Sequence, residues 1–255
     1  MPIFRRVLIQ LAIAALLVGC GPAKVVKPSA ANRAKLAEIS TQLGVEYIQK
    51  GDLEAGLKRL KRALDADPNY VDAHNTLGLL YGNLGQYEKA ERSFKRALAI
   101  GPNNSSALNN YGQYLCQLKR YDEGRKLLLK AIENPLYKKS DTALSNAGIC
   151  ALNAGDIDTA EKHFRAALQI NPTLAPTLYQ MVNLSHRSGR YLPARGYLQR
   201  YIAVGRHTAK SLWLGVQIEH ELGDKDAEAS YELQLEKNFP DSEETRLLGN
   251  QRHSD

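Results

Sequence analysis

The sequence lacks the short motifs that accompany common catalytic chemistries. It contains no HExxH, no GxSxG and no phosphate-binding glycine loop. The six histidines are scattered along the 255 residues without the spacing of metal ligands, and no cysteines and histidines form a close group. These absences indicate a protein that is not an enzyme and that needs no cofactor.

A block of like charges is also missing. No run of five or more occurs, and basic and acidic residues alternate through the body of the chain. The formal net charge is +7; without Arg5 and Arg6, which lie in a segment expected to be removed, 32 basic residues face 27 acidic ones. This pattern favours a solvated surface of mixed charge, although an acidic partner or anionic lipid headgroups would also suit the basic excess. No stripe of aromatic and basic residues points to nucleic acid as a partner.

No apolar run is long enough for a comfortable membrane span, which needs about 20 residues. Residues 7–18 are apolar with one exception and follow a short basic start, as in a signal peptide. The run ends in the tetrapeptide LVGC at residues 17–20, which resembles the bacterial lipobox. The sequence therefore predicts a lipoprotein signal peptide over residues 1–19 and acylation of Cys20.

An acylated Cys20 would hold the protein at a lipid bilayer, because two or more acyl chains give stable anchoring. Gly21 stands where an aspartate would signal retention in the inner membrane of enteric bacteria. We therefore expect the periplasmic face of the outer membrane. Residues 20–36 are predicted to form the lipidated N-terminus and a tether, since the stretch 22–31 has two prolines and no helical periodicity. A helical segment near residues 32–37 is expected to cap the front of the following domain.

A 34-residue repeat dominates the remainder of the chain. Pro68 and Pro102, which close helices, are 34 residues apart. In the frame that they set, residues 71–104 match the tetratricopeptide pattern at every signature position. These positions are Leu77, Gly78, Tyr81, Gly85, Tyr87, Ala90, Phe94, Ala97 and Pro102. Five further copies, of which the last two are degenerate, follow the same frame.

The predicted fold is all-α, a right-handed solenoid of six tetratricopeptide repeats. Each repeat is a pair of antiparallel helices, A and B, and neighbouring pairs stack because no single pair can bury its own apolar face. The predicted bounds within 37–242 are 37–70, 71–104, 105–140, 141–174, 175–208 and 209–242. The polar segment 243–255 is expected to form a C-terminal cap and tail.

Amide side chains recur on the A helices, which line the concave face of such a solenoid. Amides suit a peptide backbone because each both donates and accepts hydrogen bonds. The predicted groove residues are Asn75, Asn109, Asn110, Gln113, Asn146, Asn153, Asn183 and Arg187. The alternative is that these polar residues only solubilise an exposed helical face.

Two cysteines remain in the repeats. Cys116 and Cys150 both lie late in A helices of the adjacent third and fourth repeats. An even pair in the oxidising periplasm is a disulfide candidate, and adjacent A helices lie about 8–10 Å apart. The alternative is two small buried residues without a bond.

The lipobox followed by six repeats in 255 residues resembles the type IV pilus biogenesis lipoproteins of the PilF/PilW family. Paired cysteines in the third and fourth repeats also resemble that family. The resemblance implies a pilotin, which binds secretin subunits and promotes their localisation and multimerisation in the outer membrane. A monomer is expected. The alternative is another outer-membrane repeat lipoprotein, a scaffold for barrel-protein assembly or a tether for an envelope protease or cell-wall enzyme.

Overall fold

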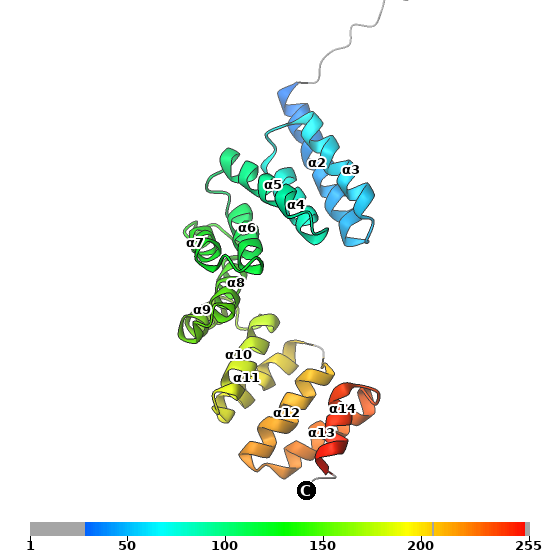
Figure 1. Ribbon diagram of the computed structural model, residues 1–255, viewed down its shortest axis with the longest axis vertical. Helices are drawn as coiled ribbons and strands as arrows, with labels where there is room; N and C mark the ends of the chain where they lie inside the picture. The colour runs from blue at the N-terminus through cyan, green and yellow to red at the C-terminus, as the bar shows by residue number, and fades with distance from the viewer. Residues whose placement is uncertain (1–28, 206, 253–255) are drawn as a thin grey trace, which may run out of the picture.

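The computed structural model describes residues 29–205 and 207–252, and within these ranges the chain forms helices and no strands. The predicted signal peptide and Cys20 lie outside the described residues. Twelve helices form six antiparallel pairs, which stack into an elongated, curved array from α2 to α14 (Figure 1). The pairs are α2 (Ala30–Gln49) with α3 (Leu53–Ala66), α4 (Val71–Asn83) with α5 (Tyr87–Ile100), α6 (Ser105–Gln117) with α7 (Tyr121–Ile132), α8 (Ser140–Asn153) with α9 (Ile157–Ile170), α10 (Ala175–Arg187) with α11 (Tyr191–Val204), and α12 (Ala209–Leu222) with α13 (Lys225–Asn238). The predicted all-α tetratricopeptide solenoid is confirmed.

In the second and fourth pairs, a glycine of helix A lets the two helices pack closely around an aromatic side chain of helix B. Phe94 and Phe164 are fully buried, and each lies against a glycine of its partner helix. A Cβ atom at Gly148 would lie 2.5 Å from Cε1 of Phe164, and one at Gly78 would lie 2.6 Å from the ring of Phe94. Gly78 and Gly148 therefore allow the two helices of their pairs to pack closely.

The turn from helix A to helix B requires a left-handed backbone conformation. In five of the six pairs this residue is a glycine with φ between 67° and 84°, as at Gly155. In the third pair the same position holds Lys119 with φ 62°, which is strained for a residue with a side chain. The six turns are therefore alike in backbone geometry although one lacks glycine.

The first helix starts earlier than the sequence pattern indicated. α2 begins at Ala30 and runs for 20 residues, so the last part of the segment 20–36, predicted as tether, is helical. Ser29 caps this helix by accepting a hydrogen bond from the backbone nitrogen of Asn32 at 3.2 Å. The residues after Ser29 are mostly good helix formers, and they extend the repeat helix toward the N-terminus without a break. The helical segment expected near residues 32–37 is therefore present as part of the first repeat helix, and the segment 20–36 predicted as tether is helical from residue 30.

The C-terminal end of the stack is covered by α14 (Glu243–Arg252). Leu248 of this helix is 1% exposed and packs with Leu212, Val216 and Leu235 of the last repeat. This helix therefore buries the apolar face of the last repeat, which a seventh repeat would otherwise have to cover. Among the described residues, no helix combines the length and the apolar character that a membrane span needs.

A row of ion pairs joins successive B helices, and its charges alternate in sign. Each pair joins one B helix to the N-cap residue of the next B helix. In four B helices, the side chain that makes this contact directly follows the small residue that packs against helix A. The pairs are Glu91–Arg120 at 2.9 Å, Arg125–Asp156 at 3.4 Å, Glu161–Arg190 at 2.7 Å and Arg195–Asp224 at 3.2 Å. We call this set the alternating ion-pair row. At this position the charge changes sign from one B helix to the next. If a B helix packed against the next but one instead of its neighbour, two like charges would therefore meet.

Candidate functional site

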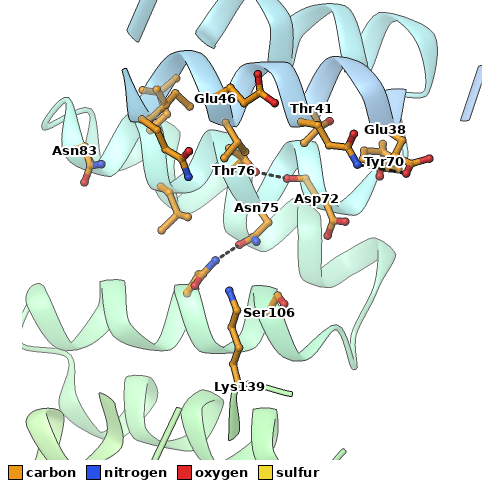
Figure 2. Close-up of a pocket in the computed structure, with 17 residues that line it drawn as sticks. Glu38, Thr41, Glu46, Tyr70, Asp72, Asn75, Thr76, Asn83, Ser106 and Lys139 are labelled. Atoms are coloured by element: carbon orange, nitrogen blue, oxygen red, sulfur yellow. Dashed lines mark hydrogen bonds between the residues drawn. The ribbon is translucent and has the colours of Figure 1, made fainter. Parts of the chain in front are cut away.

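A cavity of about 790 Å³ lies between the A helices of the first three repeats (Figure 2). Its lining comes from α2, α4 and α6, with Lys139 reaching in from the start of α8. The lining residues are Glu38, Thr41, Gln42, Val45, Glu46, Ile48, Gln49, Tyr70, Asp72, Asn75, Thr76, Leu79, Leu80, Asn83, Ser106, Asn110 and Lys139. A volume in this range is typical of ligand-binding clefts.

The cavity has apolar surface beside acidic groups. Leu79 is 38% exposed although it is aliphatic, so part of its side chain is available to a partner. Glu38, Glu46 and Asp72 supply carboxylates, and Lys139 is the one basic residue among the described residues of the lining. Such a lining suits a segment that carries both apolar side chains and a positive charge.

Tyr70 also lines the cavity, and its surroundings raise the pKa of its hydroxyl group. Burial raises the pKa of its hydroxyl, and the negative charges of Asp72, Glu38 and Asp67 raise that pKa further. The phenol therefore stays neutral and can donate a hydrogen bond across the physiological range.

Four of the predicted groove amides form one hydrogen-bonded chain across three A helices. The Asn146 amide nitrogen donates to the Asn109 side-chain oxygen at 3.0 Å, and the Asn109 nitrogen donates to the Asn110 oxygen at 3.1 Å. The Asn110 nitrogen then donates to the Asn75 oxygen at 3.2 Å. We call these four residues the amide chain. It links α4, α6 and α8, so these side chains hold neighbouring repeats together.

Burial separates the roles within the amide chain. Asn75 and Asn109 are each only 6% exposed, whereas Asn110 and Asn146 are half-buried. Asn75 and Asn110 also line the cavity. A partner in the groove would therefore meet a polar floor whose geometry is fixed by its own hydrogen bonds before binding.

The other four predicted groove residues lie outside this arrangement. Gln113, Asn153 and Arg187 are exposed at separate places on α6, α8 and α10. Asn183 is half-buried and donates a hydrogen bond of 2.8 Å to the backbone oxygen of Tyr179 in its own helix. The structure thus brings together the amides of repeats two to four and leaves these four residues apart from them and from the cavity.

The contribution of the first repeat was missed in the sequence. Thr41 stands 34 residues before Asn75, and Val45 stands 34 residues before Leu79. Both lie on α2 and line the cavity. The same repeat frame that located the amides would have found them, because equivalent positions of neighbouring A helices face the same groove.

A disulfide lies beside the amide chain. Cys116 of α6 and Cys150 of α8 are joined, with their Cα atoms 5.4 Å apart. Both residues are buried, and Cys116 packs closely against Gly124 of α7. The bond and the amide chain together connect the third and fourth repeats. Within residues 29–205 and 207–252, no group of three or more histidine, cysteine, aspartate or glutamate side chains is arranged to hold a metal ion.

Four repeat-family models match the chain. The model described as TPR repeat matches residues 44–85, and models described as Tetratricopeptide repeat match residues 71–104, 93–126 and 142–174. A similar curated protein is the type IV pilus assembly protein PilF of Pseudomonas aeruginosa. It is 30% identical over 201 residues, which cover 79% of this chain and 80% of PilF.

Solved structures of similar proteins extend this comparison. The structure of Pseudomonas aeruginosa PilF has 31% identity and a TM-score of 0.78, covering 86% of this chain and 99% of that chain. The structure of PilW, described as a widely conserved type IV pilus biogenesis factor, has 32% identity and a TM-score of 0.75, covering 83% and 97%. A tetratricopeptide repeat protein of Parabacteroides merdae, at 21% identity and a TM-score of 0.58, shares the fold.

Proposed function

The chain belongs to the family of type IV pilus biogenesis proteins that contains PilF and PilW, and from this premise we propose that it is a pilotin. In this role it binds secretin subunits and promotes their localisation and multimerisation in the outer membrane. It acts by binding and not by catalysis. The observation that carries the proposal is the likeness to the PilF structure, which covers 86% of this chain and 99% of that chain.

The proposed anchor is acylated Cys20, at the periplasmic face of the outer membrane. The sequence LVGC at residues 17–20 supports it, and these residues precede the first described residue, Ser29. An anchored scaffold would carry a bound subunit to the membrane in which the channel forms. Without the acyl chains, the scaffold and its cargo would stay in the periplasm.

The proposed binding site is the cavity between α2, α4 and α6. A secretin subunit that has not assembled exposes strand edges, which are prone to wrong pairing. An extended segment of the subunit would lie across the A helices, with apolar side chains against Leu79 and a basic group near Glu38, Glu46 and Asp72. The amide chain offers a polar floor to the segment's backbone.

Leu79→Glu tests this site. The substitution adds a carboxylate to the partly exposed apolar lining, so the fold tolerates it but an apolar client segment does not. We expect secretin capture by the purified protein to weaken by about tenfold or more, which corresponds to roughly 1.4 kcal/mol. The matched control is Leu233→Glu, which changes a residue of α13 that is 64% exposed and far from the cavity. If both variants capture secretin as well as the unchanged protein, the cavity is not the binding site.

A further inference from the structure

Six basic side chains form one face on the outside of the first two repeats. Lys58, Arg59 and Arg62 surround a hollow of about 320 Å³ beside Tyr47. One repeat later, Lys89, Arg92 and Arg96 surround a second hollow of about 350 Å³, beside Tyr81 and His74. We call these six cations the basic face. The two hollows are equivalent, because Tyr47 and Tyr81, Lys58 and Arg92, and Arg62 and Arg96 are each 34 residues apart.

The charges of the basic face are not neutralised by carboxylates. Among the described residues that line the two hollows, none is acidic. Within the described ranges none of the six cations forms an ion pair, whereas neighbouring Lys95 is paired with Glu91 at 3.0 Å. The contacts that do exist leave the charge in place. Arg96 donates to the Asn69 amide oxygen at 2.7 Å.

Aromatic rings support two of the remaining cations. The Arg59 guanidinium lies 5.8 Å from the centre of the Tyr47 ring, and the Lys89 ammonium lies 5.6 Å from the centre of the Tyr81 ring. Stacking on a ring orders a cation without neutralising it. The basic face is therefore a partly ordered set of positive charges open to an anion.

Among the B helices, α3 and α5 hold the largest numbers of basic residues. α3 and α5 each carry four basic and two acidic residues, whereas α13 carries two basic and four acidic ones. Both helices belong to the repeats that follow Cys20 most closely along the chain. The nine residues from Cys20 to Ser29 span at most about 30 Å. Ala63, next to Arg62, packs with Ala37, which lies about 10 Å along α2 from its start at Ala30.

The two hollows of the basic face share no lining residue with the cavity between the A helices. Each helical residue turns the chain by about 100°, so Tyr47 lies roughly 140° to 200° around α2 from the cavity-lining Gln42 and Val45. Tyr81 is related in the same way to Thr76 and Leu79 on α4. Glu46, Ile48 and Leu80, which also line the cavity, lie about 100° from the nearer of these tyrosines, so the hollows and the cavity are neighbouring but separate surfaces.

We propose that the basic face binds the anionic phospholipid headgroups of the membrane that holds the protein. The proposal rests on the proposed function in one respect, the acyl anchor at Cys20 that brings this end of the solenoid to the bilayer. Headgroup binding sets the orientation of the solenoid and turns the cavity toward the periplasm, where client subunits arrive. A basic residue at an anionic surface increases membrane partition by about fivefold, so six give a substantial effect at low salt.

The test uses vesicles and the mature chain, residues 20–255, with Cys20→Ser to remove the acylation site. Every described helix lies within these residues. The variant Lys58→Gln/Arg62→Gln/Arg92→Gln removes three charges from the basic face. We expect it to bind vesicles of phosphatidylcholine mixed with phosphatidylglycerol about 100-fold more weakly than the unchanged mature chain at low salt. Vesicles of phosphatidylcholine alone are expected to bind neither protein.

The matched control removes the same net charge elsewhere. Lys162, Lys210 and Lys237 are exposed on α9, α12 and α13, and none of them forms an ion pair with another described residue. The variant Lys162→Gln/Lys210→Gln/Lys237→Gln is expected to keep most of the vesicle binding. Equal losses in both triple variants would overturn the proposal, because only net charge would then matter.

Two other results also overturn it. One is the absence of binding to phosphatidylglycerol vesicles. The other is loss of vesicle binding when inorganic phosphate or an acidic peptide is added, while chloride at the same ionic strength has no such effect. The basic face would then be a site for those anions. Secretin capture by the same variants separates this proposal from the proposed function. Loss of vesicle binding with intact capture in the triple variant supports the basic face as a membrane contact only.

Discussion

Exchanging charges within the alternating ion-pair row tests how the repeats are held in order. Glu161 of α9 is 17% exposed at its side chain and accepts hydrogen bonds from both terminal nitrogens of Arg190, at 3.0 and 2.7 Å. Arg165 also donates to it at 2.6 Å. The hydrogen bonds from Arg190 are the largest cause of the low pKa of the Glu161 carboxyl, which falls from 4.5 to about 2.

The pKa sets an upper bound on what this contact contributes. A fall from 4.5 to about 2 corresponds to at most about 3 kcal/mol of folding free energy near neutral pH. Arg190 and Arg165 are 39% and 54% exposed, so solvent screening reduces the contribution to about 1–2 kcal/mol. We expect Glu161→Gln to lower the free energy of unfolding by that amount, measured by urea unfolding followed by circular dichroism.

The pH dependence has a definite sign. Because the folded state lowers the pKa of Glu161, its contribution is present above pH 4.5 and is lost as the pH falls toward 2. The stability difference between the unchanged protein and Glu161→Gln should therefore shrink over this interval. A difference that stays constant from neutral pH down to the lowest pH at which both proteins fold would refute the assignment.

Charge reversal then separates pairing from general damage. Glu161→Arg places a cation beside Arg190 and Arg165, and Arg190→Glu leaves two carboxylates together. The double variant restores an opposite pair, and we expect it to be at least about 1 kcal/mol more stable than the sum of the single effects predicts. Strict additivity would show that the row does not set the pairing of repeats.

Three further outcomes follow from the packing. Gly148→Ala should destabilise by about 1–3 kcal/mol, because its Cβ would lie 2.5 Å from Phe164, whereas Gly196→Ala, with open space around it, should not; thermal melting of both checks this. Reducing the disulfide, whose cysteines are 34 residues apart, should cost about 2–4 kcal/mol in urea unfolding, and an unchanged midpoint would contradict this. Asn109→Ala should cost about 1–3 kcal/mol, because it leaves amide-chain partners without hydrogen bonds at a buried site. A cost within error for Asn109→Ala would show that water replaces the lost partners.

Much of the architecture was predictable because its signals are local and periodic. Glycine and phenylalanine recur at fixed offsets, and in the structure Gly78 packs on Phe94 and Gly148 on Phe164. The start of α2 at Ala30 was harder to predict from the sequence, because a serine cap followed by alanines carries no repeat signature. Helix ends outside a repeat frame depend on capping and propensity, which differ by little between neighbouring residues.

The candidate site was predictable only in part. The frame placed Asn75 and Asn110 on the groove, but it could not show that the two side chains bond to each other. Contacts between side chains of adjacent repeats depend on the rotation from one repeat to the next, which a single sequence does not encode locally. The alternating ion-pair row is visible in the sequence, because Glu91, Arg125 and Glu161 occupy one repeat position with alternating sign, but the repeat pattern alone did not predict it.

The central claim is that a lipid-anchored scaffold takes secretin subunits to the outer membrane. The most direct test replaces the protein in its own bacterium with the Cys20→Ala variant, followed by membrane fractionation and electrophoresis of undenatured secretin. With the variant shown to be stable and without acyl chains, we expect secretin subunits to miss the outer membrane or multimers to form at the inner membrane. Normal amounts of secretin multimers in the outer membrane would contradict the pilotin account.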